Sequence, residues 1–147
     1  MNIKTRSFGD ISISEDDIII FTEGMYGFEE YKKYIILKDT PEDDIMYLQS
    51  VDNKDLSFVL IDPFVVINNY EPNVEIDDLE KLDVQEKSQL RFLLVAIISK
   101  EIENSVVNLK SPIAINTDLN IAKQIILENL EYPLRYPMFN NKGDGRC

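Results

Sequence analysis

Hydrophobic residues in this chain fall in short runs separated by turn-forming residues, most clearly across residues 105–127. Two valines open this stretch, Pro112 interrupts it, and branched residues resume at 113–115 and again at 121–127. A turn sequence, Asn-Thr-Asp, separates the last two runs. Branched residues in short runs between Pro, Asn and Asp predict strands rather than helices. Because proline cannot donate a ladder hydrogen bond, Pro112 is expected to start its strand or to lie at a sheet edge.

Similar runs recur along the rest of the chain, about ten residues apart. A hairpin is predicted at residues 3–13, with its turn at Gly9-Asp10, and further strands are predicted at 18–21, 34–37, 45–51, 56–61, 64–70 and 90–99. The run at 18–21 is apolar at every position, which indicates a strand buried on both faces. The length of the run at 90–99 leaves strand or helix open, but its branched residues favour a central strand. The strand at 56–61 is expected to end at Asp62-Pro63, where the residue before proline must be extended.

Helical spacing is confined to the acidic stretch at residues 73–86, where Ile76, Leu79 and Leu82 recur every three positions. This predicts one short amphipathic helix with an aspartate near its start. One helical turn is also predicted at 29–32. Residues 128–139 are expected to wrap the surface, docked by four side chains: Tyr132, Leu134, Tyr136 and Phe139.

The predicted fold is therefore mostly β: a compact β-barrel-like single domain of short antiparallel strands with one short helix. It spans residues 1–139. Residues 140–147, NNKGDGRC, are expected to form a disordered C-terminal tail.

Two glycines stand three residues apart in the loop that follows the strand at 18–21. Gly24 and Gly27 indicate backbone conformations that side chains would forbid. The loop lacks the Gly-Lys-Ser/Thr ending of a phosphate loop. Two interpretations remain open. In one, Phe28 plugs the core from a tight structural loop; in the other, the loop presents Met25 and Tyr26 to a partner.

The chain is strongly acidic, with 27 Asp and Glu against 15 Lys and Arg and a formal net charge of −12. Such a charge repels nucleic acid phosphates and anionic lipid and favours a basic partner. The excess of acids lies in the first two thirds of the sequence, because residues 105–147 hold four acids and five bases. This segregation predicts fast, salt-dependent capture of a basic partner. General solubility is an equally simple explanation of the charge.

The chemistry open to the chain is narrow, because it has no histidine and a single cysteine, Cys147. His-activated nucleophiles, an internal disulfide and His or Cys metal sites are excluded, so neither metal nor cofactor is expected. No apolar run reaches the roughly 18 residues of a membrane span. The first residues lack the apolar core of a signal peptide, so a cytoplasmic location is expected.

Three polar residues in the apolar stretch are expected to serve the fold. Asn108 and Asn116 are predicted to satisfy backbone groups in turns. Gln124 is predicted to be a buried polar side chain with a hydrogen-bond partner.

Several short motifs, taken in order, resemble those of the flagellar assembly factor family, FliW. The resemblance runs from about residue 18 to residue 139. The matching motifs are Phe21, Glu23-Gly24, Gly27-Phe28-Glu29, Leu48-Gln49-Ser50, Asp62-Pro63-Phe64, Tyr70-Glu71, Asn108 to Asn116, Lys123 to Leu127 and Glu131 to Arg135. The sequence departs from the family pattern at Thr22 and Tyr26.

The resemblance implies a non-catalytic, β-barrel-like protein of the cytoplasm with two protein partners. One is newly made flagellin, and the other is CsrA, a small basic RNA-binding repressor of flagellin translation. Export of flagellin would free the protein to take up CsrA, away from its RNA groove, and relieve repression. A monomer is expected, with no direct binding to nucleic acid or membrane. The predicted partner contacts are Glu23, Met25, Tyr26, Glu71, Asp77 and Asp78.

Two other functions remain open from the residues alone. The chain would suit a hydrolase or isomerase that uses a pair of carboxylates inside a barrel mouth, which would require a deep pocket. It would also suit a protein that takes up a partner segment as an added strand at a sheet edge.

Overall fold

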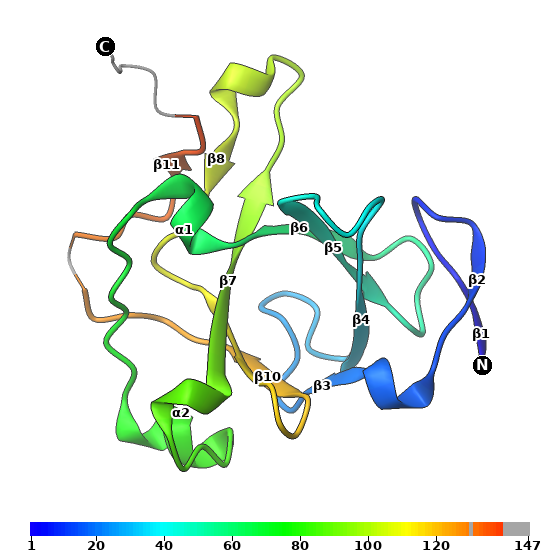
Figure 1. Cartoon of the computed structure of the whole chain (residues 1–147), viewed down its shortest axis with the longest axis horizontal. Coiled ribbons are helices and arrows are strands. Elements are labelled where there is room, and N and C mark those ends of the chain that lie inside the picture. Colours follow the sequence, from blue (N-terminus) through cyan, green and yellow to red (C-terminus); the bar gives the residue numbers. More distant parts are fainter. Residues whose placement is uncertain (130, 140–147) are drawn as a thin grey trace.

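A computed structural model describes residues 1–129 and 131–139, so the predicted tail at 140–147 lies outside the described residues. The chain folds mainly into short strands (Figure 1). The strands are β1 (Asn2–Lys4), β2 (Asp10–Ser12), β3 (Ile19–Phe21), β4 (Lys33–Leu37), β5 (Ile45–Ser50), β6 (Ser57–Ile61), β7 (Leu90–Ile97), β8 (Val106–Val107), β9 (Ile113–Asn116), β10 (Ile121–Gln124) and β11 (Tyr136–Pro137). The α-helices are α1 (Pro63–Val66) and α2 (Ile76–Lys81), and the 3-10 helices are η1 (Glu15–Asp17), η2 (Lys87–Gln89) and η3 (Ile102–Asn104).

Seven of the strands close into a barrel in the order β7-β6-β5-β4-β3-β10-β9, with β9 pairing back to β7. The long strand β7 makes this closure, since its first half pairs with β9 and residues near its end pair with β6. The barrel pairings are antiparallel except one, because β10 lies parallel to β3. The predicted barrel of short strands is confirmed, and the parallel pair corrects the expectation that every strand is antiparallel.

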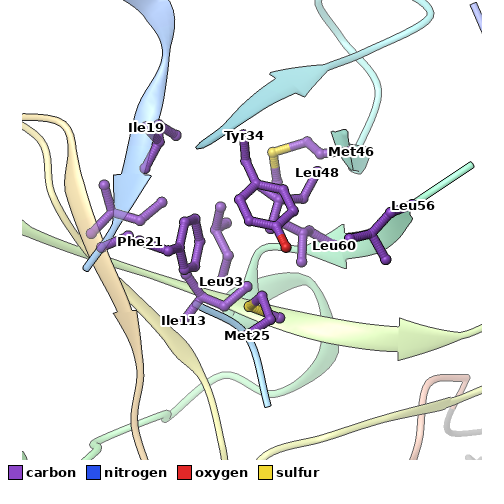
Figure 2. Close-up of a cluster of buried hydrophobic side chains, with 12 residues drawn as sticks. Ile19, Phe21, Met25, Tyr34, Met46, Leu48, Leu56, Leu60, Leu93 and Ile113 are labelled. Carbon is purple, nitrogen blue, oxygen red and sulfur yellow. The ribbon is translucent and has the colours of Figure 1, made fainter. Parts of the chain in front are cut away.

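The interior of the barrel is filled by apolar side chains (Figure 2). Each of the seven strands contributes to this cluster: Phe21, Tyr34, Leu48, Leu60, Leu93, Ile113 and Ala122. A second cluster lies on the opposite face of several of these strands, where Ile61, Leu94 and Ala114 follow directly after interior residues. Since successive residues of a strand point to opposite faces, the two clusters explain runs that are apolar at every position.

The prediction of a strand at residues 64–70 is wrong, because the chain turns into α1 at Pro63 instead. The Asp62 carboxylate accepts a hydrogen bond from the backbone N–H of Phe64 at 3.0 Å and caps this helix. Proline at the first helical position fits such a start, since its missing N–H would have no partner there. Asp62 itself is extended, as predicted.

Two smaller predictions about helices are also corrected. The described residues contain two short α-helices and three 3-10 turns rather than one helix. Residues 29–32 form turns and irregular backbone, not a helical turn. The predicted helix in 73–86 is confirmed as α2, although its cap is Glu75, which makes no side-chain capping bond.

The C-terminal segment covers part of the outer cluster and ends beside β8, with which β11 pairs. Tyr132 is buried as predicted, and so is Met138, which the sequence did not single out. Leu134 and Phe139 are 58% and 40% exposed, so the prediction that both dock is wrong. Within residues 1–129 and 131–139, no helix has the length and apolarity needed to cross a membrane.

Candidate functional site

The loop at residues 22–32 folds over one end of the barrel and is held by tight turns. Gly24 and Gly27 have φ values of 70° and 88°, which confirms the backbone conformations predicted for them. Phe28 N–H donates to the carbonyl of Met25 at 2.8 Å, and Tyr31 N–H donates to that of Phe28 at 3.0 Å. This backbone path decides which side chains face inward and which face solvent.

Of Met25, Tyr26 and Phe28, the loop buries the first side chain and exposes the other two. Met25 is 2% exposed and belongs to the interior cluster, where Figure 2 shows it beneath Leu93. The expectation that Met25 is presented to a partner is therefore wrong, and Met25, not Phe28, plugs the core. Tyr26 is 50% exposed, and Phe28 is 39% exposed with its ring edge-on to Phe58.

Two contacts fix the loop in place. Gln124 on β10 accepts a hydrogen bond from the backbone N–H of Tyr26 at 3.1 Å and donates to the carbonyl of Ser111 at 3.4 Å. The Glu29 carboxylate accepts from the N–H of Gly27 at 3.1 Å. Hydrogen bonds from its own backbone N–H and from that of Gly27 lower the pKa of Glu29. Gln124 has the hydrogen-bond partner predicted for it, but its side chain is half-buried and not fully buried.

A cluster of charges ties this loop to α2. The Lys123 ammonium on β10 lies 2.8 Å from an Asp78 carboxylate oxygen and 3.8 Å from one of Glu23. Glu23 also pairs with Lys81 at 3.2 Å. Burial favours the neutral amine of Lys123, but the hydrogen bond and charge of Asp78, with the charge of Glu23, raise its pKa. The Lys123 and Asp78 side chains are 10% and 16% exposed, so this pair forms the inner layer of the cluster.

The structure thus brings together four of the six predicted contacts, on the loop and on α2: Glu23, Tyr26, Asp77 and Asp78. Asp77 is exposed, whereas Asp78 is held by Lys123. Glu71 lies apart from the ion cluster, against the C-terminal segment. Its N–H donates to the Tyr132 hydroxyl at 2.7 Å, and its carbonyl accepts from Asn129 at 3.3 Å.

Sequence reasoning missed Lys123, the residue that links the loop to the helix. A lysine inside an apolar run was the available signal, because a buried ammonium requires a carboxylate partner. Its partner could not be named, since α2 and β10 are far apart in the sequence.

The two asparagines are confirmed as residues that satisfy backbone groups. The Asn108 side chain accepts from the N–H groups of Lys110 and Ser111 at 3.0 and 2.9 Å. Asn116 is fully buried and donates to the carbonyl of Leu82 at 2.9 Å. Pro112 directly precedes β9, as predicted.

Little in the structure resembles a catalytic centre. The barrel interior is filled with apolar side chains, and no Asp or Glu among residues 1–129 and 131–139 is buried. No group of three Asp, Glu, Cys or His side chains in the same part of the chain is placed to hold a metal ion.

The fold and the site define a small β-barrel protein with an interior filled by apolar side chains and with nearly all of its charged groups at the surface. The sequence matches the family described as "FliW protein" over residues 2–138. The chain belongs to the FliW family of flagellar assembly factors.

Individual relatives agree with this assignment. The chain is 38% identical to the flagellar assembly factor FliW of Natranaerobius thermophilus, covering 97% of this chain and 95% of that protein. It is 40% identical to the FliW of Caldanaerobacter subterraneus subsp. tengcongensis, covering 94% and 93%. A crystal structure of the flagellar assembly factor FliW superposes with a TM-score of 0.90 at 33% identity, covering 97% of this chain and 99% of that one.

Proposed function

We propose that this flagellar assembly factor binds two protein partners in the cytoplasm, newly made flagellin and the basic repressor CsrA. It acts as a monomer without catalysis. While flagellin occupies it, CsrA is free to repress flagellin translation. When flagellin is exported, the protein takes up CsrA and translation resumes, which is a shift of one protein pool between two ligands.

The observation that carries this proposal is the acidic surface of residues 71–86, which we call the α2 surface. It holds seven carboxylates and one lysine, and every carboxylate except that of Asp78 belongs to an exposed residue. A hydrogen bond with Glu128 and the charge of that residue raise the pKa of Glu75. The charges of Asp78 and Asp77 add to this rise, and a basic partner would relieve the repulsion among these carboxylates.

Exposed apolar groups lie beside these charges and could contact a partner directly. Ile76 is 73% exposed on α2, and Tyr26 is 50% exposed on the loop. Aromatic and aliphatic anchors among charged groups are typical of protein interfaces. In the proposed contact set Glu23, Tyr26, Asp77 and Glu71 reach the partner, while Asp78 holds α2 in place from beneath.

The proposal predicts that charge reversal on the α2 surface slows the capture of CsrA. The variant Asp77→Lys with Glu80→Lys changes two exposed residues that lie outside the described ion pairs. We expect association at low salt to slow by about tenfold, because steering by complementary charge raises rates by that order or more. Stopped-flow measurements at two salt concentrations test this, and the difference should shrink at high salt.

The matched control is Glu15→Lys with Asp17→Lys, which makes the same charge change at exposed residues of η1. If the control slows association as much as the α2 variant does, the slower rate reflects the net charge of the protein and not the position of the α2 surface. Calorimetry with flagellin, alone and in competition with CsrA, tests the exchange itself. Binding of only one of the two partners would refute the switch.

A further inference from the structure

A second surface lies at the other end of β7 from α2 (Figure 1). It is a groove of about 500 Å³ between the turn that joins β4 to β5, the strands β5 and β6, the residues after β7, and the end of the C-terminal segment. We call it the β5–β6 groove. The family motifs and the predicted contacts lie outside its lining.

The floor of the groove continues the outer hydrophobic cluster. Ile45 and Tyr47 on β5 and Val59 on β6 line it, and all three are half-buried. Ile45 and Val59 pack against that cluster, which also contains Met138. The groove is thus a place where side chains of the outer cluster and its surroundings reach the surface.

The walls of the groove expose large apolar side chains, which indicates a surface that binds a partner. Ile98 and Ile102, in the segment after β7, are 43% and 57% exposed, and Phe139 is 40% exposed. Single exposed apolar residues are ordinary, but several around one hollow mark an interaction surface.

The rim of the groove is acidic. Asp39, Asp43 and Asp44 line one side, and none of them forms an ion pair with a lysine or arginine of the described residues. The two flanking segments, residues 38–44 and 98–104, together hold six carboxylates and two lysines. This rim favours a cationic occupant and repels anionic lipid and nucleic acid.

Backbone pairing decides how an occupant would bind. β5 pairs with β4 and β6, and β6 pairs with β5 and β7, so the floor offers no open strand edge. An added strand is therefore excluded there, and recognition must use side chains that fill the groove. A second copy of this chain would bring its own net charge of −12 against the acidic rim.

We propose that the β5–β6 groove docks a basic amphipathic helix of a partner protein. Apolar side chains of the helix fill the groove between Ile98, Ile102 and the strand floor. Its Lys and Arg side chains meet the carboxylates of the rim. The inference does not depend on the α2 surface or on the identity of the partners proposed for it.

The probe is a fluorescein-labelled model peptide of leucine and lysine that forms an amphipathic helix, with a glutamate-for-lysine version as control. Fluorescence anisotropy measures binding to the full chain. The variant Ile98→Ser with Ile102→Ser should weaken binding by about tenfold, since buried apolar anchors dominate such interfaces. Asp39→Asn with Asp44→Asn should weaken it by about threefold and reduce its dependence on salt.

Matched controls separate this groove from other surfaces. Ile126→Ser removes an isoleucine that is 55% exposed elsewhere and should change binding less than about twofold. The η1 variant Glu15→Lys with Asp17→Lys should behave likewise, and since neither control alters the α2 surface, failure here and failure of the proposed function are distinguishable.

Isoleucine methyl NMR spectra then locate the bound peptide. Shifts at Ile45, Ile98 and Ile102 support the proposal. It is overturned by shifts centred on Ile76, by equal binding of the glutamate peptide, or by no binding to the unchanged chain. Light scattering that shows a dimer dispersed by the Ile98→Ser, Ile102→Ser variant would assign the groove to a second copy and overturn it too.

Discussion

The loop over the barrel end depends on Gly24 for a reason that a single substitution tests. Gly24 has φ +70°, and a Cβ placed there would lie 2.6 Å from the Glu29 Cα and 2.8 Å from its carbonyl oxygen. Gly27 has φ +88°, yet a Cβ there would meet no atom of the described part of the chain within 4 Å. The two glycines share the conformational constraint but differ in the steric one, so Gly27→Ala is the control for Gly24→Ala.

The expected costs follow from these two terms. A left-handed conformation costs an L-residue about 1–2 kcal/mol. Alanine also makes the unfolded chain less flexible, which stabilises the folded protein by about 0.4–1 kcal/mol. Gly27→Ala should therefore lower the free energy of unfolding by about 1 kcal/mol. Gly24→Ala carries the same cost plus about 1–3 kcal/mol for a contact that only a backbone shift can relieve.

Urea unfolding followed by circular dichroism measures the difference, which suits a chain without tryptophan. With an m-value of about 1.5 kcal/mol per M, a difference of about 2 kcal/mol places the Gly24→Ala midpoint about 1.3 M below that of Gly27→Ala. The m-values should stay equal. Equal midpoints for the two variants would refute the steric reasoning, because both would then feel only the left-handed backbone.

Two further predictions concern buried groups. Asp78→Asn should lower the free energy of unfolding by about 2–3 kcal/mol, because it leaves the Lys123 ammonium buried beside only the more distant carboxylate of Glu23. The control Asp77→Asn should change the free energy of unfolding by under about 0.5 kcal/mol. Thermal unfolding at pH 7 checks both, and equal effects would contradict the placement of the ion pair. Tyr34→Phe should raise the free energy of unfolding by about 1 kcal/mol, since the Tyr34 hydroxyl is buried and has no hydrogen-bond partner among residues 1–129 and 131–139. Burial raises the Tyr34 pKa to about 12, so the unfolded chain ionises first and stability falls as pH rises above 10; the Phe variant should show a smaller fall between pH 10 and about 12 in urea titrations.

Sequence reasoning succeeded where the controlling interactions are local. Turn formers and branched runs placed most strands, and the pair Gly9-Asp10 located the turn of the β1–β2 hairpin, where Gly9 has φ 67°. The side chains of Asn108 and Asn116 accept from backbone N–H groups two and three residues ahead, which residue type and neighbours are enough to suggest.

It failed where local signals supported two structures. The run at 64–70 has the composition of a strand, but Asp62-Pro63 is also a helix start, and α1 forms over the outer cluster. Met25 and Phe28 are both large and apolar, so the pattern could not show which one enters the barrel. The backbone path through the two glycines decides that.

The candidate site shows the same division. Glu23, Tyr26, Asp77 and Asp78 could be picked out by residue type and motif. That a buried lysine of β10 joins Glu23 to Asp78 follows only from barrel closure, which sets β10 parallel to β3 and next to the loop that leaves it. The β5–β6 groove left no sequence signal, because its walls come from four separate segments.

By itself, then, the sequence determined the strand-rich fold, the special turns, the acidic character and the family, since each depends on neighbouring residues or on their order. Tertiary structure alone decided which apolar residues fill the barrel, which carboxylates are paired with lysines and which stay exposed. Burial and ion pairing depend on distances between residues far apart in the chain, and those distances exist only once β9 and β7 close the barrel.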